Sequence, residues 1–313
     1  MRIAIMGAGG VGGYFGAKLA QAGHDVTFIA RGRHLAAMRE HGLRVRSANG
    51  DIHLAKPVVT DDPSGIAPVD AVLFAVKLWD TENAAARIAP LLARGGVVIP
   101  FQNGVESMER VGAIVGGERV LGGTAHIAAT IGAPGTIAHT GTMARLRFGA
   151  AGREPPVVAR DLAAAFREAA VDADVVVDIT RALWEKFCFL AAFSGLTAAS
   201  RQPVGVIRAD PEMRSVLEAA ITEAWTLGRA KGIALADDYV AGQMRFADGL
   251  PPEMKSSMLN DLTLGHRLEA QWLSGAVVRM ARDAGTKAPV HATLYAAVKP
   301  YVMGAAGPPV AQA

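Results

Sequence analysis

Apolar residues in the first half of the chain fall in short continuous runs, and the stretches between these runs show the three- and four-residue spacing of amphipathic helices. Strands that alternate with helices in this way predict a parallel sheet covered by helices. The predicted strands are residues 2–6, 25–30, 71–76 and 97–101, and the predicted helices are residues 10–22, ended by Gly23, and residues 81–92.

The pattern changes twice further along the chain. Between residues 120 and 148 apolar and polar positions alternate around the turn Gly132-Ala133-Pro134-Gly135, which predicts antiparallel strands at the edge of the parallel sheet. After a short strand over residues 174–177, helical periodicity continues to the end of the chain. We therefore predict two domains, an α/β domain over residues 1–178 and an all-helical domain over residues 179–313.

The helical half contains one clear start signal. Asp210-Pro211-Glu212 combines an N-cap residue, a proline at the first helical position and an early acid, and predicts a helix that stops at Lys231-Gly232. Further helices are predicted over residues 237–246, over residues 255–284 and after Pro289. The tail from Gly304 onward consists mostly of small residues and proline, and we expect it to be loose.

The composition is that of an ordinary globular protein. Hydrophobic residues make up 51% and charged residues 19% of the 313 residues, which is enough for a substantial core. The 32 basic and 29 acidic residues are interspersed, so the net charge of +3 predicts no nucleic-acid partner. The uncharged stretch over residues 121–144 is interrupted by glycines, polar residues and Pro134, so we predict no membrane span.

Cysteine and histidine usage narrows the chemistry. The only cysteine is Cys188, so no internal disulfide can form. The first residues lead directly into a strand without the features of a secretory signal, and we expect the protein to act in the cytoplasm. The eight histidines show no metal-ligand spacing, and we predict no bound metal.

Residues 7–12, Gly-Ala-Gly-Gly-Val-Gly, match the G-x-G-x-x-G fingerprint and lie between the first predicted strand and helix, as in a Rossmann-type domain. In this interpretation Gly7 permits the tight turn, Gly9 lets a pyrophosphate approach the backbone, and Gly12 lets the helix pack on the strand. Gly10 and Val11 begin the helix, whose free N–H groups would bind phosphate. The alternative is a glycine-rich turn without a ligand.

The end of the second strand distinguishes the two nicotinamide cofactors. An acidic residue there would accept hydrogen bonds from the ribose of NAD, but this chain has Ala30-Arg31-Gly32-Arg33. The guanidinium of Arg31 can pair with a 2′-phosphate, which favours NADPH/NADP as the cofactor. The alternative is that the arginines only solvate a loop.

Two polar residues follow other strands of the predicted sheet. Lys77 follows residues 71–76, and Asn103 follows residues 97–101 within Gln102-Asn103-Gly104. Because ligands of open α/β sheets bind beyond the carboxyl ends of the strands, both are candidates for cofactor contact. A surface lysine and an ordinary Asn-Gly turn are the alternatives.

Segments from both halves together resemble the ketopantoate reductase family from Met1 to about Tyr301. They are Lys77, Gln102-Asn103-Gly104, Leu183-Trp184-Glu185-Lys186, Ser256-Ser257-Met258-Leu259-Asn260-Asp261 and Glu269. The resemblance implies a Rossmann-type domain followed by a helical domain like the C-terminal domain of 6-phosphogluconate dehydrogenase. It also implies NADPH-dependent reduction of 2-dehydropantoate (ketopantoate), a small 2-oxo acid, to pantoate for pantothenate and coenzyme A synthesis.

The resemblance assigns roles position by position. Lys186 matches the family's catalytic lysine and Glu269 its catalytic-site glutamate. Ser257 matches the substrate-binding serine, and Asn103 matches the asparagine that contacts cofactor and substrate. The dinucleotide site is matched by Gly7, Gly9, Gly12, Arg31 and the cofactor-side Lys77.

These residue types suit hydride transfer to a carbonyl carbon. Negative charge develops on the carbonyl oxygen, which needs a cation and a proton nearby, and Lys186 can supply both. The ordinary lysine pKa of about 10.4 would have to fall toward neutrality, which burial can achieve. Glu269 would orient the lysine or accept a hydrogen bond from a hydroxyl of the substrate. The alternative is an ion pair between Lys186 and Glu269 that only joins two helices.

The chain departs from the family at two substrate positions. Ketopantoate reductases usually carry asparagines four and eight residues after the catalytic lysine, where this chain has Leu190 and Ser194. This spacing places them on the helix face that carries Lys186. The substrate therefore stays open between ketopantoate, a more apolar 2-oxo acid and an imine, and an NADP-binding protein without turnover is a further alternative. The sequence leaves the oligomeric state open, with a homodimer as one of the options.

Overall fold

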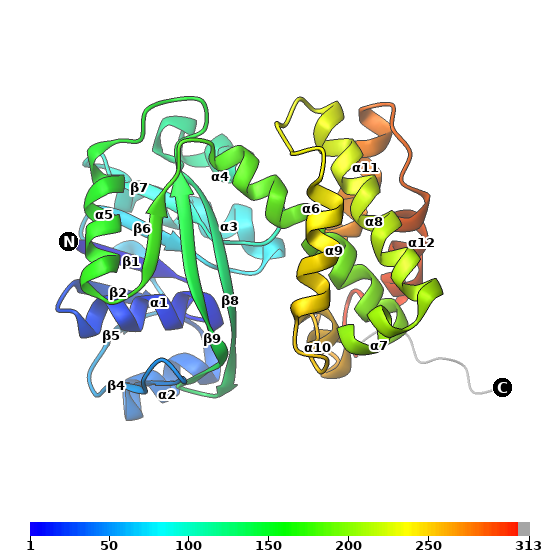
Figure 1. Ribbon diagram of the computed structural model, residues 1–313. Helices are drawn as coiled ribbons and strands as arrows, with labels where there is room; N and C mark the ends of the chain where they lie inside the picture. The colour runs from blue at the N-terminus through cyan, green and yellow to red at the C-terminus, as the bar shows by residue number, and fades with distance from the viewer. Residues whose placement is uncertain (306–313) are drawn as a thin grey trace. The chain divides into compact units, whose positions relative to one another are not determined.

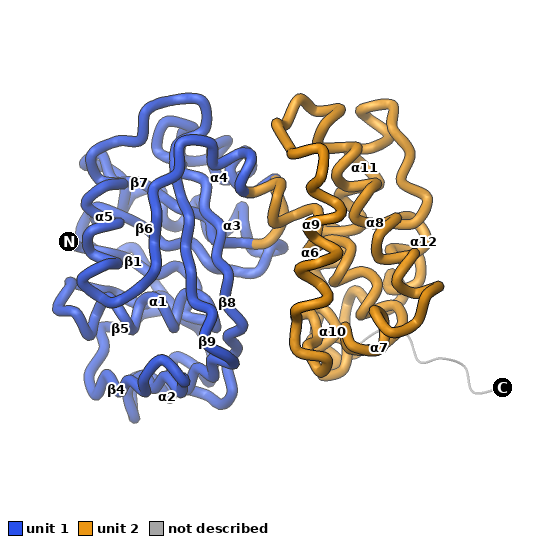
Figure 2. The backbone as a smooth tube through the Cα atoms, viewed as in Figure 1, with its two compact units in different colours: residues 1–102, 106–182 blue, residues 103–105, 183–313 orange. Residues whose placement is uncertain are grey.

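The computed structural model of the protein describes residues 1–305; most of the tail that we expected to be loose lies outside this range. The chain forms two compact units (Figure 2). The first contains residues 1–102 and 106–182, and the second contains residues 103–105 and the chain from Leu183 onward. The division therefore falls after Ala182, whereas the expected boundary was near Asp178, and Asn103 belongs to the second unit.

A five-stranded parallel sheet forms the centre of the first unit (Figure 1). Its strand order is β5-β2-β1-β6-β7, and every neighbouring pair is parallel. The predicted α/β fold class is thus confirmed. The strands are β1 (Arg2–Met6), β2 (Asp25–Ile29), β5 (Val58–Thr60), β6 (Ala71–Phe74) and β7 (Val97–Pro100).

Helices cover both faces of this sheet because successive strand residues point to opposite sides. On one face, Ile3 and Ile5 pack with α1 (Gly10–Gln21) and α5 (Val157–Glu168). On the other face, Ala4 and Met6 pack with α3 (Thr81–Ile88) and α4 (Ser107–Val115). The predicted helix over residues 81–92 is α3 followed by a separate 3₁₀ turn (Ala89–Leu92) that contains Pro90, which cannot donate a helical hydrogen bond.

A second sheet corrects our placement of the antiparallel strands. β8 (Gly122–Ala133) and β9 (Thr136–Gly149) pair antiparallel around Gly135, which has φ +74°. They are not edge strands of the parallel sheet, as we had predicted. β9 pairs instead with strands from distant parts of the chain and belongs to a second sheet. The second sheet has the order β10-β9-β3-β4, with β8 on β9; the other strands are β3 (Leu43–Arg46), β4 (Ile52–Leu54) and β10 (Asp172–Val175).

The second unit is helical, as predicted. Its core gathers buried residues of α6, α8, α11 and α12, among them Phe187, Ile221, Val277 and Leu294. Cys188 lies in the same core with no exposed surface, and burial raises the pKa of its thiol to about 12. The helices are α6 (Ile179–Ser200), α7 (Val204–Ala209), α8 (Pro211–Ala230), α9 (Tyr239–Gly249), α10 (Ser257–Thr263), α11 (Ser274–Asp283) and α12 (Pro289–Val298).

Two helix predictions in this unit had different outcomes. The start signal at Asp210 is confirmed, because its carboxylate accepts a hydrogen bond from Met213 N at 2.8 Å. The continuous helix over residues 255–284 is wrong. Gly265 takes a left-handed φ of +68° just after α10, and a 3₁₀ turn, η5 (Ala270–Trp272), precedes α11.

Among residues 1–305, the structure contains no helix with the length and apolar character needed to span a bilayer.

A buried histidine predicts acid sensitivity of the helical unit. His291 has no exposed surface; its Nε2 bonds to Ala220 O at 2.9 Å, and its Nδ1 to Ser274 Oγ at 3.1 Å. Burial lowers its pKa from 6.5 to about 4. The neutral form is therefore favoured in the folded state, and the stabilisation present above pH 6.5 is lost as the pH falls toward 4.

We expect the free energy of unfolding to fall by about 2 kcal/mol between pH 7 and pH 5 on account of His291. Urea unfolding of the wild type and of His291→Gln at the two pH values measures this loss. The other histidines are common to both proteins, so the difference between them isolates His291. Equal losses in the two proteins would contradict the assignment.

Candidate active site

The glycine loop between β1 and α1 is shaped by close backbone contacts. Gly7 has φ +97°, and a Cβ there would lie 2.9 Å from the backbone of Ala75. At Gly12 a Cβ would lie 2.2 Å from Gly7 O, so only glycine lets α1 approach β1 this closely. At Gly10 a Cβ would lie 2.0 Å from the carbonyl oxygen of Ala129 on β8. Three of the four glycines are therefore required by packing.

Gly9 has a different environment. Apart from Gly9 and its two neighbours in the chain, no described atom lies within 4 Å of a Cβ placed there, so this side of the loop is open. Gly9 is the N-cap of α1, and within the described residues no side chain caps this helix. The first N–H groups of the helix, including those of Val11 and Gly12, lack helical partners and can bind an anion. The loop can thus hold a pyrophosphate.

Arg31 lies two residues after the end of β2, at the N-cap position of α2 (Gly32–His41). Its side chain is 78% exposed, and its Nη2 lies 2.5 Å from Oδ2 of Asp80. Asp80 occupies the N-cap position of α3, yet within the described chain its carboxylate makes no capping bond. It pairs with Arg31 instead. The remaining N–H groups of the guanidinium can bind a phosphate in the fork geometry that arginine provides.

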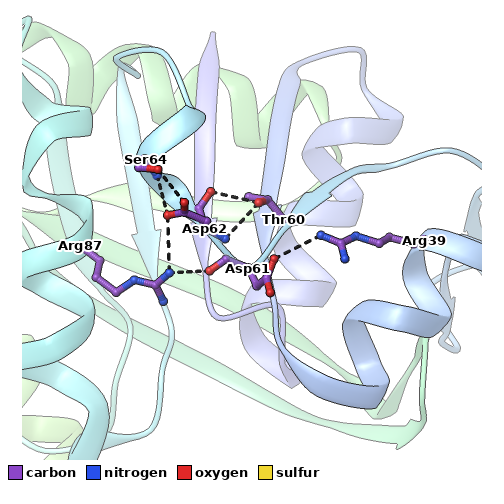
Figure 3. A network of polar contacts seen from close by, with 6 residues as sticks. All are labelled: Arg39, Thr60, Asp61, Asp62, Ser64 and Arg87. Atoms are coloured by element: carbon purple, nitrogen blue, oxygen red, sulfur yellow. Dashed lines mark hydrogen bonds and ion pairs between the residues drawn. The ribbon is translucent and has the colours of Figure 1, made fainter.

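A polar network at the end of the edge strand β5 joins α2 and α3, the helices whose N-cap residues are Arg31 and Asp80 (Figure 3). Asp61 follows β5, and its carboxylate lies 3.3 Å from Nη2 of Arg39 on α2. Nη2 of Arg87 on α3 donates to the carbonyl oxygen of Asp61 at 2.6 Å. Arg39 and Arg87 lie in the last turns of α2 and α3, so the C-terminal ends of the two helices are held through one loop.

Lys77 is exposed and follows β6, where its Nζ lies 5.8 Å from the ring centre of Trp79. The loop that carries it is fixed by Gln102, which is buried at the end of β7. The Gln102 side-chain amide donates to Val76 O and to Thr81 Oγ1, both at 2.9 Å. The carboxyl ends of β6 and β7 are thereby joined by side-chain hydrogen bonds.

In the helical unit, Lys186 lies within a polar group of three residues. Its Nζ donates to Oδ1 of Asn103 at 3.0 Å, and Glu269 is close enough to affect its charge. Burial lowers the pKa of Lys186 to about 8, and the Glu269 carboxylate acts in the opposite direction. A lysine with this pKa holds its proton at neutral pH and can release it readily, which suits a general acid.

Ser257 and Glu269 share one form of support. Each lies between two buried residues: Ser256 and Met258 flank Ser257, and Leu268 and Ala270 flank Glu269. Met258, Leu268 and Ala270 pack in one small core with Ala198 of α6. Ser257 is exposed, and within residues 1–305 its side chain makes no hydrogen bond. Two candidate residues are thus anchored on the helix that carries Lys186.

Leu190 and Ser194 follow Lys186 on α6 at one and two turns. Leu190 is half-buried at the margin of the helical core. Ser194 has no exposed surface, and its Oγ has no hydrogen-bond partner among the residues that the structure describes. The structure therefore presents an apolar side chain next to Lys186 and a buried hydroxyl one turn further along.

Sequence reasoning missed Asp80 and Gln102. The Asp80-Thr81 pair before a helix has the pattern of an N-cap, which hides its contact with Arg31. Gln102 lies next to Asn103 in the segment that we singled out, but its partners are more than twenty residues earlier. A polar residue directly after a buried strand is the one signal that the sequence offered.

Comparison with known proteins gives matches along nearly the whole chain. The family model described as "Ketopantoate reductase PanE/ApbA" matches residues 3–153. The model described as "Ketopantoate reductase PanE/ApbA C terminal" matches residues 178–302. The two models together cover both compact units.

Individual relatives match over a similar extent. A 2-dehydropantoate 2-reductase of Halobacterium salinarum is 33% identical, covering 94% of this chain and 96% of the relative. The uncharacterized oxidoreductase YkpB of Bacillus subtilis is 31% identical, covering 96% and 99%. A crystal structure of 2-dehydropantoate 2-reductase from Geobacter metallireducens superposes with a TM-score of 0.90 at 33% identity, covering 96% of this chain and 99% of that chain.

Proposed function

Because the chain belongs to the ketopantoate reductase PanE/ApbA family, whose members are oxidoreductases that use a nicotinamide dinucleotide, we propose that it reduces 2-dehydropantoate or a closely related 2-oxo acid with NADPH. The observation that carries this proposal is Lys186, whose lowered pKa of about 8 accompanies a hydrogen bond to Asn103 and the charge of Glu269. Buried groups with a shifted pKa and a specific charged partner are concentrated at functional sites.

In the proposed reaction, bound NADPH supplies the hydride that reaches C2 of the substrate. Lys186 stabilises the negative charge that develops on the carbonyl oxygen and donates its proton to it, so that the product is a 2-hydroxy acid. Asn103 accepts from Lys186 through Oδ1, which leaves its side-chain NH₂ to donate to a ligand. Glu269 keeps Lys186 protonated before transfer, and Ser257 binds the polar end of the substrate.

On the cofactor side, the open face at Gly9 and the N-terminus of α1 would hold the pyrophosphate. Arg31 would bind the 2′-phosphate, and Lys77 would contact the cofactor beyond β6. NADPH is accordingly proposed over NADH. We propose that the reaction takes place in the cytoplasm. A biosynthetic reduction with NADPH fits that compartment, and so does a sequence with one cysteine, which is buried.

Leu190 supports a second candidate substrate. A leucine one turn from Lys186 cannot hydrogen-bond the terminal hydroxyl of ketopantoate, whereas it can pack against an apolar side chain. A more apolar 2-oxo acid, or an imine of similar shape, is therefore the alternative substrate. Retention of Lys186, Ser257 and Glu269 argues against a protein that only binds NADP.

A panel of 2-oxo acids, assayed by NADPH consumption at 340 nm, tests the proposal. We expect turnover of ketopantoate, 2-oxoisovalerate or a bulkier apolar 2-oxo acid, with formation of the 2-hydroxy acid. Binding of NADPH without oxidation by any member of the panel would overturn the enzymatic proposal.

The Arg31 assignment gives a prediction for the cofactor. Arg31→Ala should weaken NADPH binding about tenfold and leave NADH binding nearly unchanged, because only NADPH carries the 2′-phosphate. Asp80→Asn should strengthen NADPH binding severalfold, since the Asp80 carboxylate competes for the guanidinium and repels the phosphate. Fluorescence titration with both cofactors measures these changes. Equal wild-type affinity for NADH and NADPH, or an unchanged NADPH affinity in Arg31→Ala, would remove Arg31 from the site.

A further inference from the structure

A buried chain of hydroxyl groups connects α6 to the start of α10. Thr197 lies on α6, its side chain has no exposed surface, and Ser256 is 2% exposed. Oγ1 of Thr197 lies 2.7 Å from Oγ of Ser256, and it also lies 2.7 Å from the carbonyl oxygen of Phe193. Oγ of Ser256 lies 3.0 Å from the backbone N of Leu259.

Counting protons gives this chain a direction. Thr197 has one hydroxyl proton, and the carbonyl oxygen of Phe193 can only accept it. Ser256 must therefore donate its own proton to Oγ1 of Thr197. The lone pairs of Ser256 remain to accept from Leu259 N, which is the N-cap bond of α10. Within residues 1–305, Oγ1 of Thr197 is the acceptor that the Ser256 hydroxyl contacts, so removing the hydroxyl of Thr197 takes away that acceptor.

Ser257 is the residue that this arrangement holds. It is the first residue of α10, directly after the N-cap Ser256, and its exposed side chain makes no hydrogen bond within the described part of the chain. Thr197 lies eleven residues after Lys186 in the sequence, which is about three helical turns, so both occupy the same face of α6. The start of α10 is thus positioned from the helix face that carries Lys186.

We propose that Thr197 is a positioning residue for substrate binding: its hydroxyl, through Ser256, sets the place of Ser257 at the start of α10. This inference rests on the proposed function, in which Ser257 binds the polar end of a 2-oxo acid. Thr197 touches neither substrate nor cofactor in this account. Loss of its hydroxyl leaves a buried Ser256 proton without an acceptor, and Ser256 can regain one only by giving up its capping geometry.

The test compares Thr197→Val, which keeps the shape but removes the hydroxyl, with Thr197→Ser, which keeps the hydroxyl. We expect Thr197→Val to raise KM for the 2-oxo acid about tenfold, with kcat within twofold and the Kd of NADPH unchanged, and Thr197→Ser to restore the wild-type KM. Ser256→Ala should raise KM in the same way, and it carries the test if Thr197→Val does not fold.

Ser274→Ala is the matched control. Ser274 is a buried hydroxyl of the same unit that bonds to His291, so its loss should lower stability without a change in KM. A rise in KM for Ser274→Ala equal to that for Thr197→Val would show a general structural effect and overturn the proposal.

Ser257→Ala distinguishes a failure of the positioning role of Thr197 from a failure of the substrate-binding role of Ser257. If Ser257→Ala raises KM while Thr197→Val and Ser256→Ala do not, Thr197 has no positioning role and the proposed function stands. If Ser257→Ala leaves KM unchanged, the substrate role of Ser257 in the proposed function fails, and the role of Thr197 fails with it.

Discussion

Replacing Lys186 by methionine is expected to lower turnover by at least 10²- to 10⁴-fold, while the Kd of NADPH stays close to that of the wild type. Methionine keeps the length and the apolar stem of lysine but removes the positive charge and the transferable proton. Pre-steady-state and steady-state NADPH oxidation, combined with cofactor titration, measures the two effects separately. Near-wild-type turnover would show that Lys186 is structural and that the proton comes from another group.

The pH profile of the wild type supplies a second measurement of the same role. A general acid must be protonated before transfer, so kcat/KM should fall as the pH rises through about 8, the lowered pKa of Lys186. An ordinary lysine would keep the rate constant to about pH 10. Glu269→Gln should move the fall to lower pH, because the Glu269 carboxylate raises the pKa of Lys186, and should reduce turnover more than stability.

Leu190→Asn is expected to increase the preference for ketopantoate over 2-oxoisovalerate by roughly ten- to hundredfold. The two substrates differ by the terminal hydroxyl, and an asparagine one turn after Lys186 would provide a hydrogen-bonding partner for it. A buried hydroxyl without a partner costs about 1–3 kcal/mol, which sets the size of the effect. The wild type should accordingly discriminate poorly, and kcat/KM for both substrates in both proteins measures the change.

Leu190→Ala is the control for this substitution, since it removes the same apolar packing without adding an amide. It should weaken both substrates alike. A wild type that already prefers ketopantoate strongly, with a preference that Leu190→Asn does not alter, would show that other groups bind the hydroxyl.

The fold class was predictable because the parallel sheet is encoded locally. The strands β1, β6 and β7 are short apolar runs that are each followed by a helix, and the turn after β1 requires the positive φ that Gly7 adopts. The second sheet was not predictable to the same degree. Alternation around Gly135 indicates that β8 pairs with β9, but the pairing of β9 with β3 joins residues such as Arg44 and Thr136, 92 positions apart, and no local pattern predicts it.

The helix predicted over residues 255–284 failed for a related reason. Its apolar positions keep helical spacing across Gly265, although the backbone there turns left-handed. A glycine within a stretch of helical periodicity is compatible both with a continuous helix and with the end of a helix. Burial of Leu268 and Ala270 in the small core with Met258 makes the break favourable, and that is a tertiary contact.

The candidate site shows the same division. The roles expected of Lys186 and Asn103 came from the resemblance to a family, and no local pattern predicts their hydrogen bond, which joins residues 83 positions apart. The supporting residues could not be predicted, because their patterns have ordinary explanations. Asp80 has the pattern of a helix cap, and Thr197 is one of many residues in an apolar helix. Supporting residues acquire their meaning only when their partners are known.

Because Cys188 is buried and is the only cysteine in the sequence, its reaction with a thiol reagent can report motion in the helical unit of the wild-type protein. The thiol lies two residues after Lys186, has no exposed surface, and has a pKa raised to about 12. A thiol reagent can therefore react only when α6 separates from its neighbours, and each chain then gains a single label. The labelling rate would measure how often the helix bearing Lys186 opens, and its slowing by a ligand would measure how far that ligand closes it.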